Sequence, residues 1–252
     1  MNLIYIFFLP VIYWCVDEKK GLHLWTAVLF SIWLNLVIIN ILSQPIPSGH
    51  AQTSLVIFFV IATWFKKKMF YGIAAALCLL TGFYLFHTGI SPMDILAGWV
   101  IGGVLFCVWF FSKKHIEKLL TAGGLRAGMI AAAALSFIMI LYRPFTEMLM
   151  PGGMLLGLAA GFCLGKKYPD FSISQISDKT GFAKYIILAG RCICGIAIFV
   201  LLFYATGKLT ALFQDTGNYD LIVFARYAIL AIWVSAGAPR LFRLTRLTDK
   251  HE

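Results

Sequence analysis

The chain has 252 residues, of which 61% are hydrophobic and 13% are charged, and its formal net charge is +10. A soluble domain of this length cannot bury so much apolar surface, so the composition excludes a water-soluble globular protein and predicts a membrane protein. The basic residues form short clusters at the ends of apolar runs, as topology signals do, and this placement argues against nucleic-acid binding.

Apolar segments of helical length follow one another along the chain, which predicts an all-α, polytopic transmembrane bundle of about nine helices. The expected spans are residues 3–16, 22–43, 50–65, 69–87, 93–112, 125–142, 147–165, 182–206 and 219–239. Crossing the hydrocarbon core takes about 20 residues, so the first and third spans are short. The first span is interpreted as a structural helix, because it lacks the small-residue cleavage site of a signal peptide.

Lysine and arginine cluster after the odd-numbered spans, whereas the loops after the even-numbered spans are poor in both. The clusters are Lys19-Lys20, Lys66-Lys67-Lys68, Lys113-Lys114 with Lys118 and Arg126, Lys166-Lys167, and Arg240, Arg243, Arg246 and Lys250. Because cytoplasmic loops carry the excess of positive charge, we expect the N-terminus outside and the C-terminus in the cytoplasm. Three polar, proline-containing turns, at residues 47–50, 87–94 and 142–147, then share the outer face.

Several residues inside the spans have a packing interpretation. Gly153, Gly157, Gly161 and Gly165 recur at a spacing of four, and Gly98 and Gly102 repeat it once, which predicts close helix packing. The six cysteines are interpreted as small apolar filler. Aromatic residues near span ends, among them Tyr13, Trp14 and Trp25, are expected to be interfacial anchors. Arg191 and Arg226 are either functional or snorkelling to an interface, and the sequence leaves this open.

Asp94 is the only Lys, Arg, Asp or Glu between Lys68 and Lys113. A lone carboxylate beside a membrane span is costly, so we expect it to have a partner. The candidate partners on the same predicted face are His50 and His87. An imidazole paired with a carboxylate supports general acid–base or nucleophilic chemistry.

The strings "PSGHAQ" at residues 47–52 and "PMDILAGWVIG" at residues 92–102 resemble the type 2 phosphatidic acid phosphatase and vanadium haloperoxidase superfamily, bacterial membrane branch. The resemblance implies a helical fold with residues 1–142 as a phosphatase-like six-helix core and 143–252 as additional C-terminal transmembrane helices. It also implies metal-free chemistry without a cofactor, in which one histidine attacks phosphorus, a second protonates the leaving oxygen, and Lys and Arg hold the phosphate.

The carry-over of functional residues from this family is partial. The family's second motif, Pro-Ser-Gly-His, matches fully at residues 47–50. The resemblance therefore assigns His50 the acid role and Ser48 and Gly49 the phosphate cradle. The family's third motif is S-R-x5-H-x3-D, and its aspartate corresponds to Asp94. Its nucleophilic histidine then falls on Ile90, and its arginine and serine fall on Tyr84 and Phe83. The family's first motif, K-x6-R-P, is reduced to Gln44-Pro45 with no lysine upstream. Three cationic groups and the nucleophile are therefore missing.

Two residues are candidates for repairing this degenerate site. His87 precedes the expected nucleophile position by three residues, and Gly89 and Pro92 would let the segment bend toward Asp94. Arg143 on the same predicted face would supply a cation for phosphate. The alternatives are that His87 is a span-end residue facing water and that Arg143 is an interfacial helix-end charge.

Two function classes follow. The first is a hydrolase acting on lipid phosphates or diphosphates at the outer face of a bacterial inner membrane. The second is a non-catalytic relative that binds lipid headgroups or a membrane-protein partner, including a second copy of itself. A transporter is weaker, because polar residues within the spans are few and no inverted repeat stands out.

Overall fold

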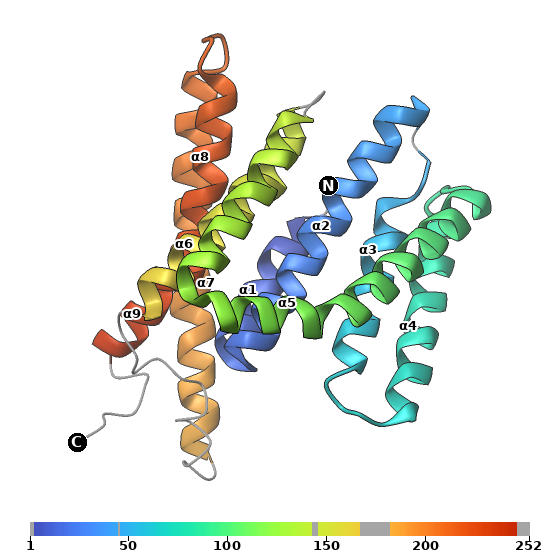
Figure 1. Cartoon of the computed structure of the whole chain (residues 1–252), viewed down its shortest axis with the longest axis horizontal. Helices are drawn as coiled ribbons and strands as arrows, with labels where there is room; N and C mark the ends of the chain where they lie inside the picture. The colour runs from blue at the N-terminus through green and yellow to red at the C-terminus, as the bar shows by residue number, and fades with distance from the viewer. Residues whose placement is uncertain (1–2, 45, 143–145, 167–181, 246–252) are drawn as a thin grey trace. The chain divides into compact units, whose positions relative to one another are not determined.

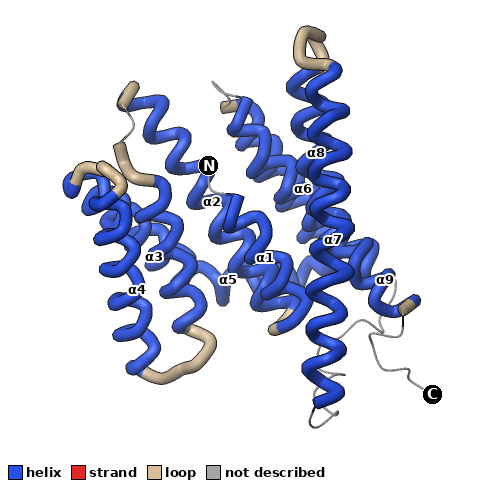
Figure 2. The backbone as a smooth tube through the Cα atoms, turned by 180° about the vertical axis from the view of Figure 1, so that it is seen from behind, coloured by secondary structure: helices blue, strands red, loops and turns tan. Residues whose placement is uncertain are grey.

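The structure is a computed structural model that describes residues 3–44, 46–142, 146–166 and 182–245. All regular structure in these ranges is helical, and no strand occurs in them (Figures 1 and 2). The helices are α1 (Leu3–Cys15), α2 (Glu18–Leu42), α3 (Gly49–Ala62), α4 (Lys68–His87), α5 (Pro92–Leu141), η1 (Thr146–Met148), α6 (Leu149–Lys166), α7 (Phe182–Leu212), α8 (Tyr219–Ile232), the π-helical η3 (Trp233–Gly237) and α9 (Ala238–Leu244). This confirms the all-α prediction.

Within the described residues, six helical segments are long and apolar enough to cross a membrane. They are Glu18–Leu42, Lys68–His87, Pro92–Lys113, Thr146–Leu164, Lys184–Leu212 and Tyr219–Leu244. Helix α3 is apolar but shorter, with 14 residues, as the short third span predicted. The prediction of a multi-pass membrane protein is therefore confirmed.

The prediction of a loop between the fifth and sixth spans is wrong. Helix α5 runs through it without a break and has 50 residues. The intervening segment contains lysines, leucines and alanines, which favour helix, and no proline. Charge ended the apolar run but not the helical backbone, so hydropathy alone placed a boundary where none exists.

The chain divides into two compact units. The first comprises residues 1–23 and 125–252, and the second comprises residues 24–124. This division by compactness groups α1 with the C-terminal helices. The expected domain boundary at residues 142–143, which is drawn from the family resemblance, stays a prediction.

In the first unit, α6 and α8 lie side by side (Figures 1 and 2). A Cβ added to Gly153 would lie 2.6 Å from the carbonyl oxygen of Phe224. At Gly157 the added atom would collide with the backbone of Ala228. The predicted close packing through small residues is therefore confirmed at these positions.

A buried junction joins α1, α7 and the C-terminal helices of the first unit. Trp14 and Arg191 are both fully buried. The Trp14 indole N–H donates to the carbonyl of Val234 at 2.9 Å, and Arg191 donates to the carbonyl of Trp14 at 3.4 Å. Val234 belongs to the π-helical turn, where a wider helix leaves carbonyls to be satisfied by other donors.

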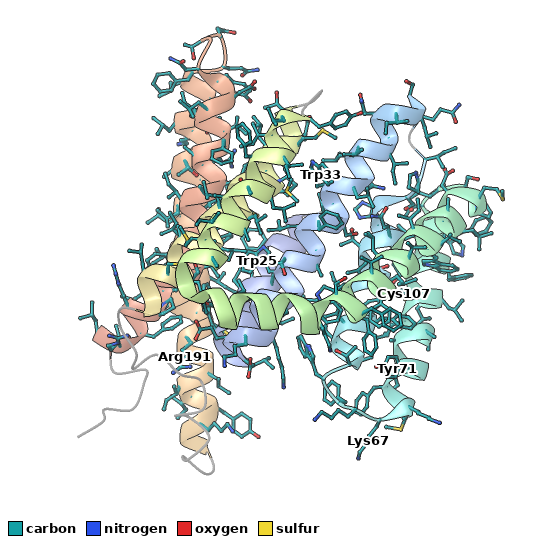
Figure 3. All side chains as sticks on the ribbon, in the orientation of Figure 1. Trp25, Trp33, Lys67, Tyr71, Cys107 and Arg191 are labelled. Carbon is teal, nitrogen blue, oxygen red and sulfur yellow. The ribbon has the colours of Figure 1, made fainter. Side chains whose placement is uncertain are left out.

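The burial of these residues and of Trp25 in the second unit corrects one expectation, and the burial of Arg191 decides between two others. Tyr13 and Trp14 are fully buried, and Trp25 of α2 is 1% exposed, so none of them is an interfacial anchor. The guanidinium of Arg191, labelled in Figure 3, packs against the Phe242 ring at 5.8 Å. Arg191 is thus a packed residue of the helix junction and does not snorkel to an interface.

Candidate functional site

The string of residues 47–50 forms the start of α3 in the second unit. The Ile46–Pro47 peptide bond is cis, and Ser48 follows in an extended conformation. The Ser48 side chain accepts a hydrogen bond from the Ala51 amide at 3.4 Å, so Ser48 is the N-cap of α3. Ser48 is buried, and its hydroxyl is used by the helix it starts.

A chain of buried hydrogen bonds holds this turn against α2. The Asn35 amide donates to the Pro47 carbonyl at 3.0 Å and to the Gln52 side-chain oxygen at 3.2 Å. The Gln52 amide in turn donates to the Ser31 carbonyl at 2.8 Å and to the Ser31 hydroxyl at 3.1 Å. In a membrane interior such groups must be satisfied within the protein, so this network fixes where α3 begins.

No role was assigned to Asn35 or to Gln52 from the sequence. Asn35 is 7% exposed and Gln52 is fully buried. The signal that points to both is an amide side chain inside a long apolar run, because such a group needs partners there.

Helix α5 lies against the start of α3. The Ser48 amide donates to the Asp94 carbonyl at 3.0 Å. A Cβ added to Gly98 would lie 2.6 Å from the Ser48 carbonyl oxygen, and one added to Gly102 would lie 2.7 Å from that of Gln52. The two resembling motifs therefore meet backbone to backbone, and glycines of the second motif make room for the first.

The turn between α4 and α5 is a helix stop of a recognised type. The Gly89 amide donates to Phe86 and the Ile90 amide to Leu85, at 3.0 and 3.1 Å, which is the Schellman pattern. Gly89 has φ +90°, a left-handed conformation that favours glycine. In this motif the residue after the glycine is often apolar and packs back on the helix end.

Ile90 fills that role. It packs against the apolar cluster of Ala51, Leu85 and Ile95, which joins α3, α4 and α5. The position at which the family spacing places a nucleophile is therefore occupied by a helix-stop residue packed in an apolar cluster.

The start of α5 explains the rest of the turn. The Met93 amide donates to the Ser91 hydroxyl at 3.3 Å, and Pro92 is the first residue of α5. Asp94 lies in the first turn, where a negative charge is favoured by the helix dipole. The carboxylate of Asp94 makes no hydrogen bond or ion pair with the part of the chain that the structure describes.

The structure brings together only part of the expected site. The backbones of Ser48 and Asp94 adjoin, and His50 follows in the first turn of α3, half-buried. His87 ends α4 exposed, with its ring 4.8 Å from that of Phe83 on the same helix, and it makes no hydrogen bond to Asp94. Arg143 lies outside the described residues. The assigned roles of all six candidates stay predictions.

Gly49 has a packing task at this site. A Cβ there would lie 2.6 Å from the side-chain oxygen of Asn35. The side of Gly49 on which a side chain would lie is thus occupied by Asn35 of α2.

Charge is distributed unevenly along the second unit. Residues 21–65 and 69–112 contain no Lys or Arg. Lys66, Lys67 and Lys68 lie at the turn between α3 and α4, where Figure 3 labels Lys67, at the opposite end of both helices from the α4–α5 turn. The next lysines of this unit follow only at positions 113, 114 and 118. Among the described side chains, no three His, Cys, Asp or Glu gather as a metal ion would require.

Together the helices and their apolar lengths define a multi-pass, all-helical membrane protein. Residues 149–250 match the family model described as "PAP2 superfamily phosphatase, transmembrane extension". This match covers the C-terminal part of the chain only, and it supports membership of the PAP2 superfamily, that of the type 2 phosphatidic acid phosphatases, as the N-terminal motifs implied. No curated protein matches the chain, and no solved structure does.

Proposed function

We propose that this membrane phosphatase-family protein binds the headgroup of a membrane phospholipid at the α3–α5 end of its second unit and does not hydrolyse it. The observation that carries the proposal is the packing of Ile90 against Ala51, Leu85 and Ile95. Isoleucine has no nucleophilic atom, and at this position it is partly buried against the apolar cluster.

The missing cations support the same conclusion. Phosphoryl transfer depends mainly on positioning and on charge stabilisation of the phosphate oxygens. Losing one such donor costs about 3–4 kcal/mol, and each 1.4 kcal/mol is about tenfold in rate. With three cations absent from the family positions, ordinary turnover would fall by several orders of magnitude.

The groups that remain suit recognition. The N-termini of α3 and α5 lie together through the Ser48–Asp94 hydrogen bond, and helix N-termini favour anionic groups such as phosphate. His50 can donate to a phosphate oxygen. The half-buried carboxylate of Asp94 has no partner in the described chain, so it suits a headgroup that carries a hydrogen-bond donor, such as an amine or a hydroxyl.

Binding can be measured by native mass spectrometry of the purified chain with phosphatidylethanolamine, phosphatidylglycerol, phosphatidic acid and diacylglycerol. We expect the amine- or hydroxyl-bearing phospholipids to bind, and Asp94→Asn and His50→Ala each to weaken binding by roughly tenfold. Thr81→Val, which removes only a hydrogen bond within α4, is the matched control. The proposal would be overturned if diacylglycerol bound as tightly as the amine- or hydroxyl-bearing phospholipids. It would also be overturned if neither site variant weakened phospholipid binding.

One observation favours the hydrolase alternative. The hydrogen bond from Ser48 to Asp94 keeps both motifs in contact, as a working phosphatase site would need. In that case His87 would be the replacement nucleophile and Arg143 a phosphate-binding cation. Any phosphate release must then disappear in His87→Ala, and an undiminished rate would remove His87 from that role.

We place this site at the outer face of a bacterial cytoplasmic membrane, with the N-terminus outside. The support is the distribution of lysine and arginine between odd and even loops. The ligands proposed are membrane lipids, and a membrane-protein partner or a second copy of the chain is the remaining candidate.

A further inference from the structure

Arg226 lies in α8 of the transmembrane extension, in the first unit. One of its terminal nitrogens donates to the Phe203 carbonyl of α7 at 3.3 Å. This is its one hydrogen bond to the described chain, and its buried Nε has no partner. A guanidinium carries five N–H donors, and leaving them unmet in an apolar setting is costly.

The guanidinium is held between two rings. Its centre lies 4.7 Å from the Phe203 ring and 5.4 Å from the Tyr227 ring. Gly207 provides the space beside it, since a Cβ there would approach Arg226 to 3.1 Å. The guanidinium thus lies close to two rings and to the open side of a glycine, and a planar guanidinium can bind an oxyanion through a fork of two N–H donors at once.

The surroundings of Arg226 indicate which class of oxyanion it would bind. Arg226 is the eighth residue of α8, so its Cα lies about 10 Å from the start of the helix. The Cα–Cβ bonds of a helix tilt toward its N-terminus, which for α8 is the direction of the nearer membrane surface. On this stretch of α7 and α8 the exposed side chains include Leu201, Tyr204, Leu221 and Ile229, which are mostly apolar, as a lipid-facing surface is.

We infer that Arg226 binds the phosphate of a membrane lipid at the α7–α8 end of the extension. No carboxylate in the described chain pairs with it, and the exposed apolar surface around it admits acyl chains. The inference concerns a different unit from the α3–α5 site and does not rest on the function proposed there.

The test uses the full chain in neutral detergent, with phosphatidylglycerol as the probe and native mass spectrometry as the readout. Diacylglycerol lacks the phosphate, and glycerol phosphate lacks the acyl chains. Arg226→Gln should lower phosphatidylglycerol binding by about tenfold, and Arg226→Lys should lower it less, because charge remains without the fork. Lys208→Gln, which removes an exposed cation of α7, should leave it unchanged.

Each contrary result has a definite meaning. Unchanged phosphatidylglycerol binding in Arg226→Gln overturns the inference, as does glycerol phosphate binding as tightly as the lipid. If Arg226→Gln does not fold, Arg226→Lys alone must show weaker binding. Repeating the comparison in Asp94→Asn separates the two sites, because the loss caused by the Arg226 variant must persist there.

Discussion

The family spacing and the packing of the helices describe Ile90 in two different ways. The family spacing marked it as a lost nucleophile, and this was predictable from Asp94 alone. That it also completes a Schellman stop and joins an apolar cluster needed the packing of three helices. A spacing rule identifies a position, but it does not tell which neighbours surround the side chain.

Ile90→His tests this packing. Placing an imidazole in the cluster of Ala51, Leu85 and Ile95 should lower the free energy of unfolding by about 2–4 kcal/mol, because apolar contacts are lost and a polar group is buried. Ile90→Leu should cost less than about 1.5 kcal/mol. Denaturation in mixed micelles measures both, and equal stability of the two variants would show that Ile90 is not packed as described.

Asn35 supports the turn that starts α3. Asn35→Leu leaves the Pro47 carbonyl and the Gln52 side chain without their donor, and each buried unpaired group costs about 1–3 kcal/mol. We expect a clear fall in unfolding temperature. Ser54→Ala, which removes only a bond to the Ala51 carbonyl within α3, is the control. A fall no larger than that of the control would contradict the network's importance.

At the scale of elements, α3 and α5 are held by close backbone approach. Gly102→Ala would place a Cβ 2.7 Å from the Gln52 carbonyl, whereas a Cβ at the adjacent Gly103 meets nothing within 4 Å. Gly102→Ala should therefore destabilise the second unit by about 1–3 kcal/mol. Gly103→Ala should be neutral or slightly stabilising, because alanine favours helix. Equal free energies of unfolding for the two variants would contradict the close approach of α5 to α3 at Gly102.

Most elements were predictable because apolar length and charge both mark helix ends in a membrane protein. The exception was α5, where a charged segment continued as helix. Tertiary arrangements such as the burial of Trp14 under the π-helical turn were not predictable, since a tryptophan near a span end has the same sequence pattern in lipid or in a core.

For the whole molecule, the family model matched by residues 149–250 and the motifs near the N-terminus indicate the same superfamily. The residues of the candidate site were all proposed from the sequence, and their roles stay predictions. The sequence could not show that Ser48, Gly49 and Gly98 each have a packing task, so that the motif can persist without turnover. Side chains that build a helix junction and side chains that bind phosphate share one sequence pattern.

Membrane orientation is a property of the whole chain. In a variant whose six cysteines are replaced, a single Ser91→Cys should react with an impermeant maleimide added outside the cell. Lys67→Cys, at the opposite end of α4, should react only after the cytoplasmic side is exposed. Labelling in the reverse order would move the α3–α5 site to the cytoplasmic face.

The central claim is that the motif survives here as a helix junction around Ile90 and not as a phosphoryl-transfer site. Phosphate release from a panel of lipid phosphates and diphosphates tests it most directly, using purified wild type, His50→Ala and vanadate. We predict that wild type releases no more phosphate than His50→Ala. Release that vanadate inhibits and that His50→Ala abolishes would contradict the claim.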